Sequence, residues 1–187
     1  MVRTTPADPT NHHYSQTDLC KAAGISMATA NNWMNSGALQ SIDLGIRTLR
    51  KPRVFDLTAI YHAKATAEMV KWLGVPPTTA AAIARRTTAK GYTWYLSIPG
   101  NLARGKSPLD AFAAVFWSDD CHDWDAWVEF PSGADILRIS LKEIAEERRE
   151  PRLAHRPFLL LPVTKYFVSV YKKCEAILIA SGKRQGS

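Results

Sequence analysis

The sequence has few of the features that mark secreted, metal-binding and membrane proteins. Only three cysteines occur in 187 residues, at positions 20, 121 and 174, and their odd number and wide spacing argue against a disulfide framework or a paired metal site. No apolar run approaches the roughly 20 residues that span a bilayer. The polar start also lacks the apolar core of a secretion signal. We therefore expect a cytoplasmic protein with no membrane partner.

Acidic residues are scarce in the first half of the chain. Residues 1–91 hold 11 Lys or Arg against 5 Asp or Glu, whereas residues 92–187 hold 13 against 12. Most of the net charge of +7 therefore belongs to the first half. A basic module joined to a nearly neutral one indicates that the basic part meets a polyanion.

Helix-capping residues organise the first half after a loose tail over residues 1–13. Ser15 or Thr17 can cap a short helix that Gly24 ends, and Ser26 can cap a second helix over residues 27–35. Two helices joined by so short a glycine-containing turn form a helix-turn-helix. An irregular hairpin over residues 38–55 should follow, and then two helices over residues 56–74 and 78–88.

The second half, after Gly91, is richer in aromatic and β-branched residues and predicts a small antiparallel sheet. We expect strands over residues 92–98, 111–117, 124–130 and 136–139, with turns at 99–101 and 131–133. A charged helix over residues 140–150, an apolar segment over 158–163 and a closing helix over 164–181 complete this half. The predicted fold class is therefore α+β, with a domain boundary near residue 90.

Several short motifs occur in a fixed order between residues 14 and 86. They are Tyr14, Gly24-Ile25-Ser26, Thr29, Trp33, Gly37-Ala38-Leu39, Arg53-Val54-Phe55-Asp56, Gly74-Val75-Pro76 and Ala81-Ala82-Ile83. This order resembles the MerR family of winged helix-turn-helix proteins. The resemblance implies that residues 14–90 bind double-stranded DNA as a winged helix-turn-helix. It also implies a homodimeric transcriptional regulator whose residues 91–187 form a small α+β domain for dimerisation or for a ligand or protein effector.

A helix the size of residues 27–35 fits the major groove, where its early residues meet base edges. An asparagine amide can bond adenine through two hydrogen bonds, and alanine can touch a thymine methyl. Hydroxyls and the clustered cations of the hairpin can bond phosphate oxygens. The expected DNA contacts are therefore Tyr14, Ala28, Thr29, Asn31, Asn32, Arg47, Arg50, Lys51 and Arg53.

The sequence departs from the MerR pattern in two ways. Family members commonly have Arg and Tyr where this chain has Asn31 and Asn32, and no long dimerisation helix with heptads follows residue 86. Excisionases and phage regulators share the winged fold without that helix. A phage or mobile-element DNA-binding factor, excisionase-like or terminase-like, therefore stays open as an alternative to a transcriptional regulator.

Two motifs of the second half contain residue types used in other chemistry. Residues 118–125 hold four carboxylates, a thiol and an imidazole, but no second set of ligands, which predicts a polar loop. Residues 100–107 have the spacing of a phosphate-binding loop, yet Pro108 follows where a helix must begin. We expect no metal, no cofactor and no enzymatic activity. An independent enzymatic or partner-binding role of residues 91–187 is the remaining alternative.

Overall fold

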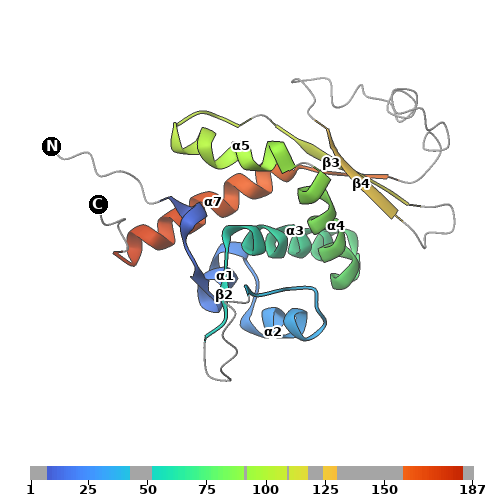
Figure 1. Ribbon diagram of the computed structural model, residues 1–187. Coiled ribbons are helices and arrows are strands. Elements are labelled where there is room, and N and C mark those ends of the chain that lie inside the picture. The colour runs from blue at the N-terminus through green and yellow to red at the C-terminus, as the bar shows by residue number, and fades with distance from the viewer. Residues whose placement is uncertain are drawn as a thin grey trace.

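The computed structural model describes residues 8–42, 52–90, 92–108, 110–117, 124–129 and 158–182. Over these ranges the chain is α+β, as predicted, with helices below and around a small sheet (Figure 1). The elements, in chain order, are η1 (Pro9–Asn11), β1 (Tyr14–Ser15), α1 (Gln16–Ala23), α2 (Met27–Asn35), β2 (Val54–Phe55), α3 (Leu57–Leu73), α4 (Pro77–Lys90), α5 (Tyr92–Ala103), β3 (Phe112–Trp117), β4 (Trp124–Glu129), β5 (Phe158–Leu161) and α7 (Val163–Ala180).

The ends of α1 and α2 are set by the caps that the sequence predicts. Ser15 Oγ accepts the backbone N–H of Asp18 at 3.2 Å, and the Asp18 carboxylate accepts the backbone N–H of Ser15 at 3.2 Å, which forms a capping box. Gly24 ends α1 in the left-handed conformation, with a φ of 75°. Ser26 Oγ then accepts the N–H of Thr29 at 3.0 Å and starts α2.

A two-stranded antiparallel sheet joins the start of α1 to the start of α3. Tyr14 pairs with Phe55 and Ser15 with Val54, and the Ile42 N–H donates to the Val54 carbonyl at 2.9 Å. The bond from Ile42 to Val54 joins the two arms of the predicted hairpin, and β1 pairs with its second arm. Its tip lies outside the described residues, and so do Arg47, Arg50 and Lys51.

The strand predicted over residues 92–98 is wrong, because α5 is a helix and the turn predicted at 99–101 lies within it. Ile98 is fully buried, and Leu102, four residues later, packs against the same core. Residues four apart share one face of a helix, so burying that face outweighs the strand preference of the local composition. Pro99 lies inside α5 and leaves it one backbone donor short.

The three-stranded antiparallel sheet has the order β4-β3-β5, and Phe116 pairs with Asp125 on one side and Phe158 on the other. The strands predicted over residues 111–117 and 124–130 are confirmed, as is the closing helix, observed as α7. The strand predicted over 136–139 and the helix predicted over 140–150 lie outside the described residues.

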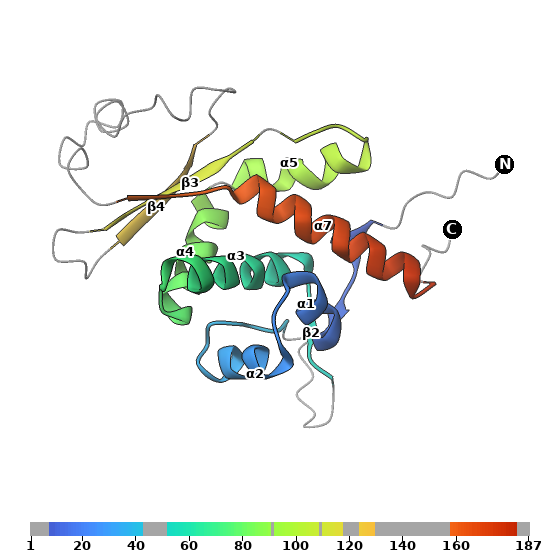
Figure 2. The ribbon, with the colours of Figure 1, turned by 180° about the vertical axis from the view of Figure 1, so that it is seen from behind.

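The last helix, α7, packs on α1 and α3, as the view from behind shows (Figure 2). The rings of Tyr61 and Phe167 lie 5.7 Å apart between centroids, and Lys173 Nζ donates to the Ala22 carbonyl at 3.3 Å. One cluster of buried side chains consequently extends from β1 to α7. The division into two domains near residue 90 stays a prediction.

Candidate nucleic-acid interface

Helix α2 has one buried face and one exposed face. Ala30 is fully buried and Trp33 is 7% exposed, so these two side chains anchor the helix on the core. Ala28, Asn31 and Asn32 lie on the exposed side. In both overall views α2 lies at the edge of the molecule opposite α5 (Figures 1 and 2). One side of this short helix is therefore exposed to solvent.

The exposed face of α2 is polar and uncharged. The helix contains no acidic and no basic residue, and its three asparagines supply both hydrogen-bond donors and acceptors. Met27, at the first position of the helix, is 46% exposed. Such a face carries no negative charge that would repel a phosphate backbone, and its amides match the donor and acceptor groups of base edges.

The side chain of Asn31 is hydrogen-bonded to a residue of α1. Gln16 Nε2, at the first position of α1, donates a hydrogen bond to Asn31 Oδ1 at 2.8 Å. Sequence reasoning missed Gln16, because this contact depends on how α1 and α2 cross and no local pattern encodes that crossing. The Thr29 hydroxyl lies 2.8 Å from the Ser26 hydroxyl, so it takes part in the cap at the start of α2.

Tyr14 is buried, so it cannot make the phosphate contact predicted for it. Its side chain is 1% exposed, and its hydroxyl donates to the Pro9 carbonyl at 2.9 Å. Burial, with a smaller contribution from Cys174, raises the pKa of Tyr14 above its usual value. Because the hydroxyl lies buried between Pro9 of η1 and Cys174 of α7, it has no free surface to offer a phosphate.

Arg53 is the one hairpin cation of the predicted set within the described residues. It is exposed, and its Nη1 approaches Met34 Sδ at 3.1 Å, which places it beside the C-terminal half of α2. Ala28, Asn31 and Asn32 are thus exposed on α2, and Arg53 lies beside the same helix, whereas Thr29 is half-buried in its cap.

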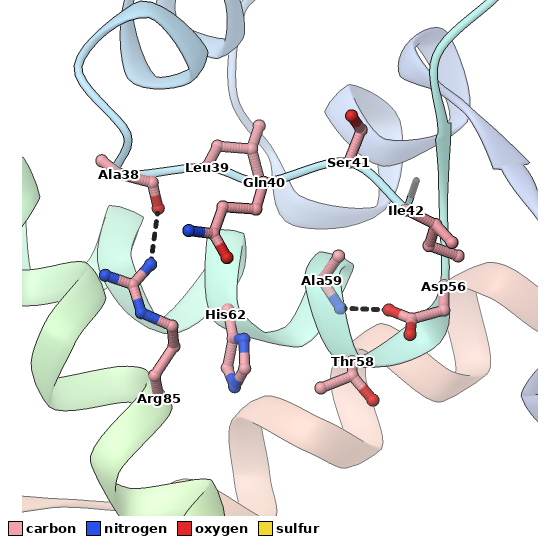
Figure 3. Close-up of a pocket in the computed structure, with 10 residues that line it drawn as sticks. All are labelled: Ala38, Leu39, Gln40, Ser41, Ile42, Asp56, Thr58, Ala59, His62 and Arg85. Atoms are coloured by element: carbon pink, nitrogen blue, oxygen red, sulfur yellow. Dashed lines mark hydrogen bonds between the residues drawn. The ribbon is translucent and has the colours of Figure 1, made fainter. Parts of the chain in front are cut away.

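A pocket of about 210 Å³ lies where residues 38–42 cross α3 and α4 (Figure 3). Arg85 extends from α4 toward the loop and donates from Nη1 to the Ala38 carbonyl at 3.4 Å. Asp56, at the other end, accepts the Ala59 N–H at 2.7 Å and caps α3. Of these two contacts, the one from Arg85 attaches the loop that follows α2 to α4, and the one from Asp56 fixes the start of α3.

His62 lines the same pocket and is neutral at pH 7. Burial, and secondarily the nearby Arg85 guanidinium, lower its pKa from 6.5 to about 4. Its Nε2 lies 2.9 Å from the Thr88 hydroxyl, which itself donates to the Ala84 carbonyl at 3.1 Å. The Thr88 oxygen must therefore accept from His62, which assigns the proton of the neutral imidazole to Nε2.

The motif over residues 100–107 takes a geometry unlike that of a phosphate-binding loop. It begins inside α5, which ends at Ala103, and its backbone turns back so that the Lys106 N–H donates to the Asn101 carbonyl at 2.9 Å. A phosphate-binding loop precedes a helix, whereas this segment follows one. Most of the acidic segment over residues 118–125 lies outside the described residues.

In comparisons with known proteins, the chain matches no protein-family model and no curated sequence. Across the described residues, no helix is both long and apolar enough to cross a membrane.

Proposed function

We propose that the chain binds double-stranded DNA as a winged helix-turn-helix, with α2 in the major groove and the hairpin predicted over residues 38–55 on the sugar-phosphate backbone. The observation that carries this proposal is the exposed, acid-free asparagine face of α2, held outward by the burial of Ala30 and Trp33. On this basis the protein is a sequence-specific cytoplasmic regulator of transcription that acts as a homodimer.

The dimensions of α2 support the proposal. Nine helical residues extend about 13 Å, and the major groove, roughly 12 Å wide, admits one helix. The capped start of α2 fixes its first turn, because Ser26 and Thr29 bond each other and the backbone there. A helix whose direction is fixed can hold the same side chains against the same base edges in each complex.

The charge distribution supports it as well. Phosphate contacts supply most of the affinity of DNA-binding proteins and carry no sequence information, whereas base contacts supply specificity. Here α2 is uncharged, and the cations of the predicted set belong to the hairpin, where Arg47, Arg50, Lys51 and Arg53 fall within seven residues. The two roles are thus assigned to different segments of the chain.

Fluorescence anisotropy of the full chain with a random-sequence duplex and with a duplex selected from a random pool tests the proposal. We expect binding to both that weakens steeply as salt increases, and tighter binding to the selected duplex. Asn32→Ala should reduce the discrimination between the two duplexes by about 1–3 kcal/mol. Asn11→Ala, which removes the same amide from an exposed position on η1, is the matched control and should leave it unchanged.

Absence of salt-sensitive affinity for any duplex would refute the proposal. Equal losses on random and selected DNA in Asn32→Ala would refute base reading by the exposed face of α2. A palindromic selected site with half-sites about one helical turn apart is expected for a homodimer, whereas direct repeats would contradict that arrangement.

A further inference from the structure

We propose that Gln16 determines which base Asn31 reads, by holding the Asn31 amide in one orientation that matches adenine. This inference rests on the proposed function, since it concerns the sequence preference of the same surface. Its structural basis is the hydrogen bond from Gln16 Nε2 to Asn31 Oδ1, 2.8 Å long, which connects the first turn of α1 to the middle of α2.

An asparagine amide on a solvent-exposed helix can turn over, which exchanges the positions of its oxygen and nitrogen. A donor fixed beside Asn31 removes that freedom, because only the oxygen of the amide can accept its hydrogen bond. Gln16 can act as such a donor. It is half-buried at the first position of α1 and donates from Nε2; the reverse arrangement, in which Gln16 Oε1 would accept from Asn31 Nδ2, is the one that Gln16→Glu imposes.

The hydrogen bond leaves Asn31 able to meet a base. An amide oxygen has two lone pairs, and Gln16 occupies one. Among the described residues Asn31 has no other side-chain partner, so the second lone pair and both N–H groups stay available. In the major groove adenine presents a donor at N6 beside an acceptor at N7, whereas guanine presents two acceptors. An amide with one acceptor and one donor in fixed order therefore favours adenine.

Asn32 provides an internal comparison. It is exposed on the same face of α2, and its side chain has no hydrogen-bond partner within the described ranges. Its amide can therefore present its two ends in either order. We expect the base position read by Asn31 to be strict for adenine and the position read by Asn32 to be more tolerant.

The test is selection of bound duplexes from a random pool by the full chain and by three variants of Gln16. Gln16→Lys keeps a donor beside Asn31 and should keep the adenine preference, about 5-fold or more over each other base. Gln16→Glu offers only acceptors, so it should bond the Asn31 nitrogen, turn the amide over and reduce the preference to less than about 2-fold. Gln16→Ala removes the restraint and should give an intermediate preference.

Thr17→Lys and Thr17→Glu are the matched controls, because they place the same charges at an exposed neighbouring position of α1. They should change affinity for all duplexes alike and leave the adenine preference intact. Thermal unfolding of each variant confirms that its fold is retained.

An adenine preference that is equal in the wild type, Gln16→Lys and Gln16→Glu would overturn the inference. An adenine preference that is retained in Gln16→Glu and lost in Gln16→Lys would also overturn it. The same holds if Asn31→Ala removes an adenine preference at no position of the selected site. These outcomes require a chain that binds duplex DNA, so they leave the proposed function standing, whereas a wild type that binds no duplex refutes both.

Discussion

Acidification should destabilise the folded chain through His62 over a defined pH range. In the folded state, burial and the Arg85 guanidinium lower the pKa of His62 from 6.5 to about 4. Between these two values the unfolded chain holds a proton on His62 that the folded chain does not. Stability from this residue is therefore complete above pH 6.5 and falls as the pH drops toward 4.

The size of the effect follows from the two pKa values. A difference of one pKa unit corresponds to about 1.4 kcal/mol. Most of the range between the unfolded and the folded pKa of His62 lies between pH 7 and pH 4.5, so the free energy of unfolding should fall by about 2 kcal/mol over these pH values. The hydrogen bond to Thr88 does not offset this loss, because Nε2 donates it in both protonation states.

Urea denaturation followed by tryptophan fluorescence at a series of pH values measures this effect. The chain has five histidines, so the wild type has to be compared with His62→Gln, which keeps a donor for Thr88 but does not titrate. The difference between the two proteins should show the loss of about 2 kcal/mol between pH 7 and pH 4.5. Identical pH dependence in both proteins would refute the account of His62.

Two further substitutions test the interface and its support. Arg50→Ala should weaken binding to all duplexes similarly, because one phosphate contact is lost. The plot of log affinity against log salt should become less steep by about one. An altered base preference with an unchanged slope would contradict this prediction. Trp33→Ala should cost about 3–5 kcal/mol of unfolding free energy, since Trp33 is 7% exposed and anchors α2, with Trp33→Phe losing less in the same urea titration. A loss below about 1 kcal/mol in Trp33→Ala would show that the core does not depend on this side chain.

Local signals in the sequence were sufficient for the helices of the first half. Serine before α1 and α2, Asp56 before α3 and glycine after α1 and α3 act within three or four residues, so the pattern predicts the helix ends without knowledge of the tertiary structure. The strands β3 and β4 and the helix α7 were also predicted from local signals, namely residue composition, apolar spacing and turn residues instead of caps.

Features that depend on distant contacts were missed. Tyr14 was predicted to bond a phosphate through its hydroxyl, but it is buried beside Pro9 of η1 and Cys174 of α7, and α7 comes at the other end of the chain. The pairing of β1 with β2 and the bond from Gln16 to Asn31 likewise join segments separated in sequence. The composition of α5 is typical of a strand, but Ile98 and Leu102 lie four residues apart, as on one face of a helix. Packing of both side chains on the core favours the helix.

Site-specific photo-crosslinking to duplex DNA is the most direct test of the central claim, that the exposed face of α2 meets DNA. A photo-reactive amino acid is placed at Ala28 in the full chain, and in a second protein at Ala103, which is exposed on α5 at the opposite edge of the molecule (Figure 1). We expect a crosslink from position 28 that disappears at high salt, and none above background from position 103. Equal crosslinking from both positions, or crosslinking from position 103 alone, would contradict it.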